Sequence, residues 1–310
     1  TPPAVDPLPA TAERLVEANY RDILLKQNAS VVAAFLPTDS FIGTMALSPN
    51  PTMYQYDLAT RAAGEPEFDD DTTGSFTGAA TLVDAITPLQ TIFEITGETD
   101  FTDTLEGSVI LVGEEQMGVV DYDSVTHMLT VERGVADTLP TDHLAAAVLW
   151  TIDDDLVGDE RAYVQGETVE AKVLTRTANG VLDEADAALL SIVVTARQAR
   201  PYPPGNLKVD GVLVLSGLSG DHAAPVLTWA HRDRILQADQ IVGHTEASVG
   251  PEAGVTYNIR LYDVDDPLVL LRDVPGVVGD TWTYDAGMQT ADGDPFAVWC
   301  EIEADRGGIV

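Results

Sequence analysis

The stretch Tyr257-Asn-Ile-Arg-Leu-Tyr262 alternates large apolar residues with polar ones. Successive side chains of a β-strand point to opposite faces, so the first tyrosine, the isoleucine and the leucine would line a buried face. Val226-Leu-Thr-Trp229 and Phe296-Ala-Val-Trp-Cys-Glu-Ile302 alternate in the same way. Three such strands predict an antiparallel sandwich with Trp229 in its core and the apolar residues of the third strand, Cys300 included, facing inward.

Upstream of these strands, short strand-like segments recur at intervals of about ten residues, separated by turn residues. These segments are Tyr54–Leu58, Thr91–Ile95, Ser108–Val112, Met117–Val120, Met128–Val131, Val169–Thr175 and Ser191–Thr195. Helical spacing of apolar residues predicts one short helix over Glu13–Gln27, with Thr11 as its N-cap, and a weaker one over Leu182–Leu190. The expected fold class is mainly β, with linked β-sandwich domains and one short N-terminal helix.

Two proline-rich segments predict boundaries between parts of the chain. Residues 1–10 contain four prolines and predict an extended linker. Arg200-Pro-Tyr-Pro-Pro-Gly-Asn206 holds three prolines and a glycine, which cannot continue a central strand. We therefore expect a separate sandwich over residues 200–310. Little more than the turn Asp305-Arg-Gly-Gly-Ile-Val310 follows its third strand, so we expect the sandwich to lack a last strand and the chain to belong to a larger protein.

The composition narrows the functional classes. The 310 residues include 51 acidic and 16 basic side chains, a formal net charge of −35. Because no Lys or Arg cluster is present to neutralise a phosphate backbone, nucleic-acid binding is excluded. An acid-rich, lysine-poor surface stays soluble in salt and favours a marine habitat, although a generically acidic surface explains the same composition. No apolar run reaches the length of a membrane span, and Cys300 has no partner for an internal disulfide.

No motif in the sequence predicts catalysis. His231-Arg232-Asp233 matches the start of a protein-kinase catalytic loop, but the other kinase motifs are absent, and a polar loop after a strand explains the triplet. The histidines have no metal-ligand spacing, and phosphate-loop, dinucleotide and Gly-x-Ser-x-Gly patterns are missing. No pair of carboxylates for glycan hydrolysis stands out among 51 acidic residues. We expect no enzyme, no catalytic or cofactor-binding residues and no cofactor.

Three acidic runs are candidates for binding calcium. They are Asp69–Asp71, Asp153–Asp155 with Asp159 and Glu160, and Asp263–Asp266. None has the spacing of an EF-hand loop, with its central glycine and terminal glutamate. Irregular calcium sites use backbone oxygens that a sequence does not reveal. We therefore assign no metal ligands and interpret the runs as solvated acidic loops, with a structural calcium ion as the alternative.

Five stretches of the chain carry a resemblance to a known family. They are Gly107-Ser-Val-Ile-Leu-Val-Gly-Glu-Glu-Gln116, Val131-Glu-Arg-Gly-Val-Ala-Asp-Thr-Leu-Pro-Thr-Asp-His143, Tyr163-Val-Gln-Gly-Glu-Thr-Val-Glu-Ala-Lys-Val-Leu-Thr-Arg-Thr177, Ala199-Arg-Pro-Tyr-Pro-Pro-Gly-Asn206 and Leu227-Thr-Trp-Ala-His-Arg-Asp-Arg234. They resemble the C-terminal region of the large tail-tip proteins of siphophages, which are baseplate or host-specificity components related to gene transfer agent proteins. The last two stretches are the most specific. The resemblance implies a structural protein of the virion.

The resemblance also implies a domain arrangement and a set of partners. Residues 11–96 and 156–199 would form one discontinuous β-sandwich with the N-terminal helix, and residues 97–155 a small β domain inserted into it. Residues 200–310 would form a sandwich similar to a fibronectin type III domain. The expected partners are other tail-tip proteins, further copies of the chain in a trimer, and a host surface receptor. The expected location is the virion tail tip, outside the cell when it acts.

Two alternatives to a structural role stay open. The first is a receptor- or glycan-binding module at the distal tail, which should display tryptophans clustered on a surface rim. The candidates for that rim are Trp150, Trp229, Trp282 and Trp299. The second is an extracellular bacterial adhesin with stacked fibronectin-like domains, which calcium sites at domain junctions would favour.

Overall fold

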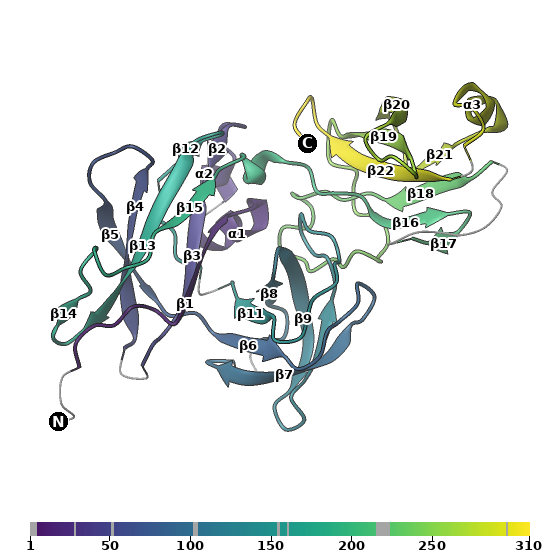
Figure 1. The fold of residues 1–310 in the computed structure, drawn as a ribbon. Coiled ribbons are helices and arrows are strands. Elements are labelled where there is room, and N and C mark those ends of the chain that lie inside the picture. The colour runs from purple at the N-terminus through teal and green to yellow at the C-terminus, as the bar shows by residue number, and fades with distance from the viewer. Residues whose placement is uncertain are drawn as a thin grey trace. The chain divides into compact units, whose positions relative to one another are not determined.

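The computed structural model describes residues 5–27, 29–50, 53–101, 105–153, 156–159, 161–214, 224–295 and 297–310. The fold is mainly β, with 43% strand and 7% helix, several antiparallel sheets and a six-stranded barrel, which confirms the mainly β part of the expected class. The chain divides into two compact units (Figure 1). The first comprises Thr1–Val131 and Asp142–Ala199, and the second comprises Glu132–Thr141 and Arg200–Val310.

The first unit contains a set of small antiparallel sheets. A five-stranded sheet is formed by β14 (Gly180–Val181), β13 (Thr168–Thr177), β4 (Gln55–Ala62) and β5 (Asp69–Ser75) in that order, with β15 (Leu190–Val193) also on β13. Two strand pairs accompany it, β1 (Ala12–Glu17) with β3 (Ile42–Leu47) and β2 (Asp39–Ser40) with β12 (Tyr163–Val164). The apolar cluster that these strands bury includes Ala46, Met53, Tyr56, Leu58, Phe76, Ala171 and Val173.

The N-terminal segment differs from the predicted single helix. The prediction of a helix over Glu13–Gln27 is wrong in its first half, because Ala12–Glu17 is strand β1, and Thr11 is not an N-cap. The helix α1 covers only Tyr20–Lys26, and Asn19 caps it. The Asn19 side chain accepts a hydrogen bond from the Asp22 amide at 2.9 Å, and the Asp22 carboxylate accepts one from the Asn19 amide at 3.4 Å. This reciprocal capping box fixes where the helix begins.

The other helices of the first unit also differ from the prediction. The weaker helix predicted over Leu182–Leu190 is wrong. The segment contains turns, and strand β15 begins at its last residue, Leu190. Three acidic residues lie close together in that segment, and aspartate side chains favour turns because they bind nearby backbone amides. The Ala185 amide, for example, donates a hydrogen bond to the Asp183 carboxylate. Short helices that had not been predicted are α2 (Ala29–Val32) and the 3-10 helix η2 (Arg197–Ala199).

A closed six-stranded barrel forms the other part of the first unit. Its strands, in sequence order, are β6 (Ala79–Leu82), β7 (Ile92–Thr99), β8 (Val109–Val112), β9 (Glu115–Asp123), β10 (Met128–Glu132) and β11 (Val148–Thr151). They neighbour one another in the order β10-β7-β6-β11-β8-β9. The barrel starts at Ala79, whereas the sequence-based division placed the start of the inserted module at residue 97. Because β7 pairs with β6 on one side and β10 on the other, both early strands are needed to close the barrel.

The second unit consists of two antiparallel sheets (Figure 1). The four-stranded sheet has the order β17 (Val212–Leu213), β16 (Gly205–Val209), β18 (Val226–Ala230), β21 (Thr281–Thr283). The three-stranded sheet has the order β20 (Leu270–Val277), β19 (Thr256–Asp263), β22 (Val298–Asp305). A short helix, α3 (Ala286–Ala291), connects β21 toward β22.

The core of the second unit bears out the predicted alternation. Trp229 is 4% exposed, and its ring packs edge-on against Tyr257 with 5.1 Å between ring centroids, which confirms its expected burial. Ile259 and Leu261 belong to the same cluster. Cys300 pairs with Leu261 across the strands, yet it is exposed rather than buried as expected. In the part of the chain that the structure describes, β22 pairs only with β19, so its second edge leaves Cys300 uncovered.

Two remaining expectations concern Phe296 and membrane spans. Phe296, which was expected to face the core, lies outside the described residues. Among the residues that are described, no helix is long and apolar enough to cross a membrane.

Candidate functional site

The segment Leu227–Arg234 contains a buried arginine, Arg232, which lies two residues after the end of strand β18. Its side chain is 4% exposed and donates hydrogen bonds to backbone carbonyls. The acceptors are the oxygens of His231 at 2.9 Å, Gly243 at 2.9 Å, Ala247 at 3.1 Å, His244 at 3.2 Å and Glu246 at 3.3 Å. Burial lowers the pKa of Arg232, but a guanidinium stays protonated in proteins. One charged side chain therefore fixes the backbone of residues 243–247.

The neighbours of Arg232 also bind internal partners. The Asp233 carboxylate accepts hydrogen bonds from the amides of Ile235 and Leu236, at 2.9 and 3.0 Å, and so caps the turn that follows. His231 is buried, and its ring nitrogen lies 2.7 Å from the hydroxyl of Tyr257. The triplet that matches a kinase loop therefore orders a turn, and its aspartate is occupied by backbone amides.

Arg234 completes this buried network. Its guanidinium pairs with Glu252 at 2.9 Å, and Arg306 pairs with the same carboxylate at 2.7 Å. Arg234 and Glu252 are almost fully buried, so the carboxylate is shared by two cations away from solvent. Removing one member of such a group leaves an uncompensated buried charge. The stability of residues 231–252 therefore depends on Arg306, which directly follows β22.

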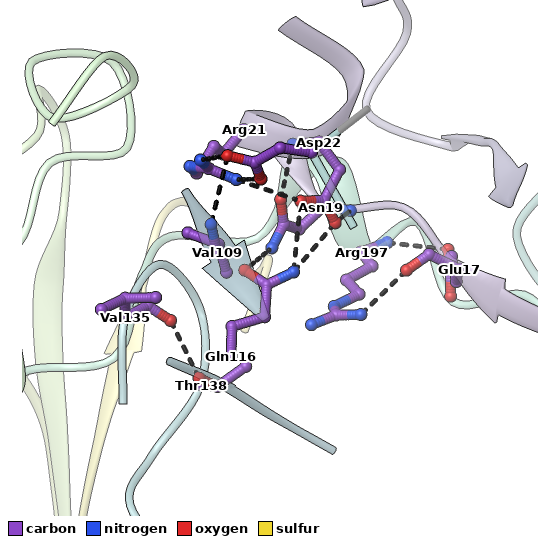
Figure 2. Close-up of polar contacts among 10 residues, drawn as sticks. Glu17, Asn19, Arg21, Asp22, Val109, Gln116, Val135, Thr138 and Arg197 are labelled. Carbon is purple, nitrogen blue, oxygen red and sulfur yellow. Dashed lines mark hydrogen bonds and ion pairs between the residues drawn. The ribbon is translucent and has the colours of Figure 1, made fainter. Parts of the chain in front are cut away.

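A second buried network lies in the first unit and joins helix α1 to the barrel (Figure 2). The amide nitrogen of Gln116, on β9, donates to both carboxylate oxygens of Asp22, at 3.2 and 3.0 Å. The amide nitrogen of Asn19 donates to the Gln116 oxygen at 3.1 Å. All three residues are at least nine-tenths buried. The side chains that cap the helix thus also bind the barrel, and the two parts of the unit share one hydrogen-bond network.

Two ion-paired residues extend this junction. Arg21 forms a two-pronged pair with Asp153, with both nitrogen–oxygen distances 2.8 Å. The same carboxylate accepts the amide of Val109 at the start of β8, at 3.2 Å. Glu17 accepts a hydrogen bond from the Arg197 amide (Figure 2) and others from Thr195, and these bonds connect β1 to the segment after β15. These contacts are satisfied within the unit and hold its strands in place.

One buried acid–base pair lies in the barrel. His143 Nε2 lies 2.8 Å from the Glu115 carboxylate, and both side chains are buried. The side-chain pair connects the start of β9 to the segment before β11. The backbone of His143 forms a separate bridge with Ile86.

The acidic runs are engaged in ordinary internal contacts where they are described. Asp153 pairs with Arg21, and Asp159 accepts hydrogen bonds from the hydroxyls of Thr60 and Tyr163. Burial and the bond to Asp159 raise the pKa of Tyr163. Within the described parts of the chain, no three His, Cys, Asp or Glu residues are placed to hold a metal ion. Asp154, Asp155 and Glu160, and the side chains of Asp70 and Asp71, lie outside the description.

The third acidic run caps turns. Asp263 accepts the amide of Asp265 at 2.8 Å, and Asp266 accepts the amide of Leu268 at 3.1 Å. These bonds stabilise the β19–β20 hairpin loop, because aspartate side chains mimic a backbone turn.

The tryptophans do not gather on one surface. Trp150 and Trp229 are buried, in different units, and Trp282 packs against the core cluster of the second unit. Trp299 alone is exposed, at 53%. The surface rim of tryptophans that a binding module would show is therefore not formed by these four residues.

Sequence reasoning missed both buried networks. The partners of Arg232 are backbone carbonyls, which have no sequence signature, and Gln116 lies far along the chain from Asn19. The one local signal was the pair Asn19 and Asp22 at capping-box spacing. Comparison with known proteins adds no site: no family model matches the sequence, and no curated protein is significantly similar to it.

Proposed function

We propose that this chain is a non-enzymatic structural module of a siphophage tail tip or baseplate, part of the apparatus that attaches the particle to its host. In this proposal, the second unit is a fibronectin type III-like domain. In the same proposal, the first unit is a β-sandwich with a small β module inserted, and that module is the barrel that begins at Ala79. The stretches Ala199–Asn206 and Leu227–Arg234, which resemble tail-tip proteins most specifically, support the assignment.

One observation carries the proposal of a structural role. Every charged residue of the segment 231–234 is buried and binds backbone or another side chain of the same unit. A catalytic site needs polar groups that are free to meet a substrate. Residues that instead lock a loop to a sheet favour a rigid building block, and the junction of Asn19, Asp22 and Gln116 supports the same role in the first unit.

The partners follow from the proposal. The chain would assemble with other tail-tip proteins and as a homotrimer, and it would act outside the cell on the virion. Copies with a charge of −35 repel one another, so contacts between copies should avoid the acidic residues 51–150.

Mass spectrometry of purified particles tests the proposal. Peptides from both units should be present in gradient-purified virions, in a copy number per particle that is a multiple of three. Their absence from particles that contain the capsid and tail-tube proteins would show that the chain is not a virion component.

A receptor-binding module at the distal tail is the second candidate, and the exposed Trp299 favours it. Trp299 lies opposite Tyr262 on β19, and Tyr262 lies opposite the half-exposed Leu270 on β20, so an aromatic and apolar row crosses the outer face of this sheet. A Trp299→Ala variant separates the two roles. Loss of adsorption to host cells by intact, normally assembled particles would favour receptor binding, and unchanged adsorption would favour the structural role alone.

A further inference from the structure

A shallow pocket lies over strands β16 and β18 of the second unit. The cavity measures about 190 Å³, and its polar lining consists of Asn206, Lys208, Thr228 and Ser248. Lys208 and Thr228 are direct partners across the two strands. We propose that this pocket binds the carboxylate of an acidic sugar, with Lys208 as the residue that recognises the charge.

Lys208 is the first reason for assigning an anion. Among the residues that the structure describes, it is the only Lys or Arg for which no ion pair, hydrogen bond or ring contact is found. An unpaired ammonium is exceptional in a chain with 51 acidic side chains. Residues 200–250 of the second unit carry five acidic and four basic side chains, so the segment that forms the pocket is nearly neutral while the whole chain carries −35. An anion therefore meets less repulsion here than elsewhere on the chain.

The neutral polar groups are the second reason and point to a sugar. The hydroxyl oxygen of Ser248 accepts the amide of His231 at 3.1 Å, which leaves its proton free to donate. Asn206 and Thr228 offer one amide and one hydroxyl, and both groups can donate and accept. Phosphate sites commonly add arginine forks or several backbone amides to a lysine, and the lining of this pocket includes no arginine. One ammonium among neutral donors and acceptors matches a single carboxylate on a ring with several hydroxyls.

The hydrogen bonds from Arg232 to the five backbone carbonyls, here called the carbonyl cage, hold the lining of the pocket in place. Arg232 binds the carbonyl of Ala247, next to Ser248, and the Val249 amide donates to the His231 carbonyl at 3.0 Å. Asn206 is fixed on the other side, because its amide donates to the His244 carbonyl at 2.6 Å. The lining is therefore preorganised, which reduces the entropy lost on binding.

The size of the cavity limits the ligand to one sugar unit. Drug-sized ligands need pockets of about 300 Å³ or more, so a cavity of about 190 Å³ suits a smaller molecule. A hexuronate is of the matching size. The source is either a free sugar acid or one unit of an acidic polysaccharide, and both present the same carboxylate.

The test is an NMR titration of the full 310-residue chain with D-glucuronate, with neutral D-glucose as the control ligand. We expect saturable shifts of the amide signals of Thr228 and Ser248 with glucuronate and none with glucose. Lys208→Met should weaken binding at least tenfold. Lys172→Met is the matched control, because Lys172 lies on β13 in the other unit, and it should leave the affinity unchanged.

Two further arms complete the experiment. A uronate tetrasaccharide that binds more than tenfold tighter than the monomer identifies a polysaccharide as the source, and equal affinity identifies the free sugar acid. The proposal would be overturned if neither glucuronate nor the uronate tetrasaccharide gave saturable shifts. It would also be overturned if the folded Lys208→Met variant bound glucuronate with the same affinity as the unmodified chain. The outcome is independent of whether the chain is a virion component.

Discussion

Replacement of Arg232 by methionine tests whether the buried arginine organises the second unit. Methionine keeps the aliphatic stem but removes the guanidinium that binds five carbonyl oxygens. Each buried acceptor left without a partner costs about 1–3 kcal/mol. Because the loop of residues 243–247 can relax toward water, we count only two or three such acceptors. We therefore expect a loss of about 3–5 kcal/mol in the free energy of unfolding of this unit.

Urea unfolding followed by tryptophan fluorescence measures this loss. Three of the four tryptophans, Trp229, Trp282 and Trp299, lie in the second unit, so the signal reports mainly on its unfolding. Arg260→Met is the control, because Arg260 is partly exposed on β19, and its ion pairs with Glu301 and Glu303 contribute no more than about 1 kcal/mol. If the free energy of unfolding of Arg232→Met lies within about 1 kcal/mol of that of the unmodified chain, the hydrogen bonds from Arg232 to the carbonyls do not hold the loop, and the reasoning is wrong.

Three other predictions concern the core, the charge and one half-buried carboxylate, that of Glu13. Trp229→Ala should cost about 3–5 kcal/mol in the same urea assay, and a cost below about 1 kcal/mol would contradict its place in the core. The melting temperature should rise between roughly 10 mM and 0.5 M NaCl, since salt screens the repulsion of 51 acidic residues, whereas a flat or falling curve would refute this. Burial raises the pKa of Glu13 from 4.5, so its native state favours the protonated form and loses stability as the pH rises through that pKa. Glu13→Gln should therefore raise the melting temperature at pH 7, with the gain shrinking below pH 4.5, and equal melting temperatures at pH 7 would rule this out.

The alternation of apolar residues was sufficient to predict the core of the second unit. Trp229, Tyr257 and Ile259 lie where the period of two places them, because a strand in a sheet with one solvated face leaves that pattern in the sequence. The pattern does not reveal which strands lie at an edge. Cys300 has the inward register, and it is exposed because nothing in the described chain pairs with the second side of β22.

The N-terminal helix was predicted wrongly because its apolar residues fit two periods. Leu15 and Val16 fit a helical face when taken with Ile23, but β1 pairs along its whole length with β3. Tertiary pairing therefore overrides a weak local preference for helix. The capping box of Asn19 and Asp22 was the better signal, because it depends on two side chains at a fixed spacing.

The buried networks depend on contacts between residues far apart in the sequence. Nothing near Gln116 indicates that its amide binds Asn19 and Asp22, and nothing near Arg232 identifies carbonyls as its partners. One trace is present in the sequence at Gly205. A Cβ atom at that position would collide with the Arg232 guanidinium and approach the His244 carbonyl, so the glycine after the proline pair makes room for the cage.

Immunogold labelling of intact particles tests the central claim most directly. Antibodies raised against this chain, imaged on negatively stained virions, should place gold at the distal tip of the tail, and particles that lack the gene product should show no label. Label on the capsid or the neck, or its absence from tips that are intact and accessible to antibodies against a neighbouring tip protein, would contradict the assignment to the tail tip.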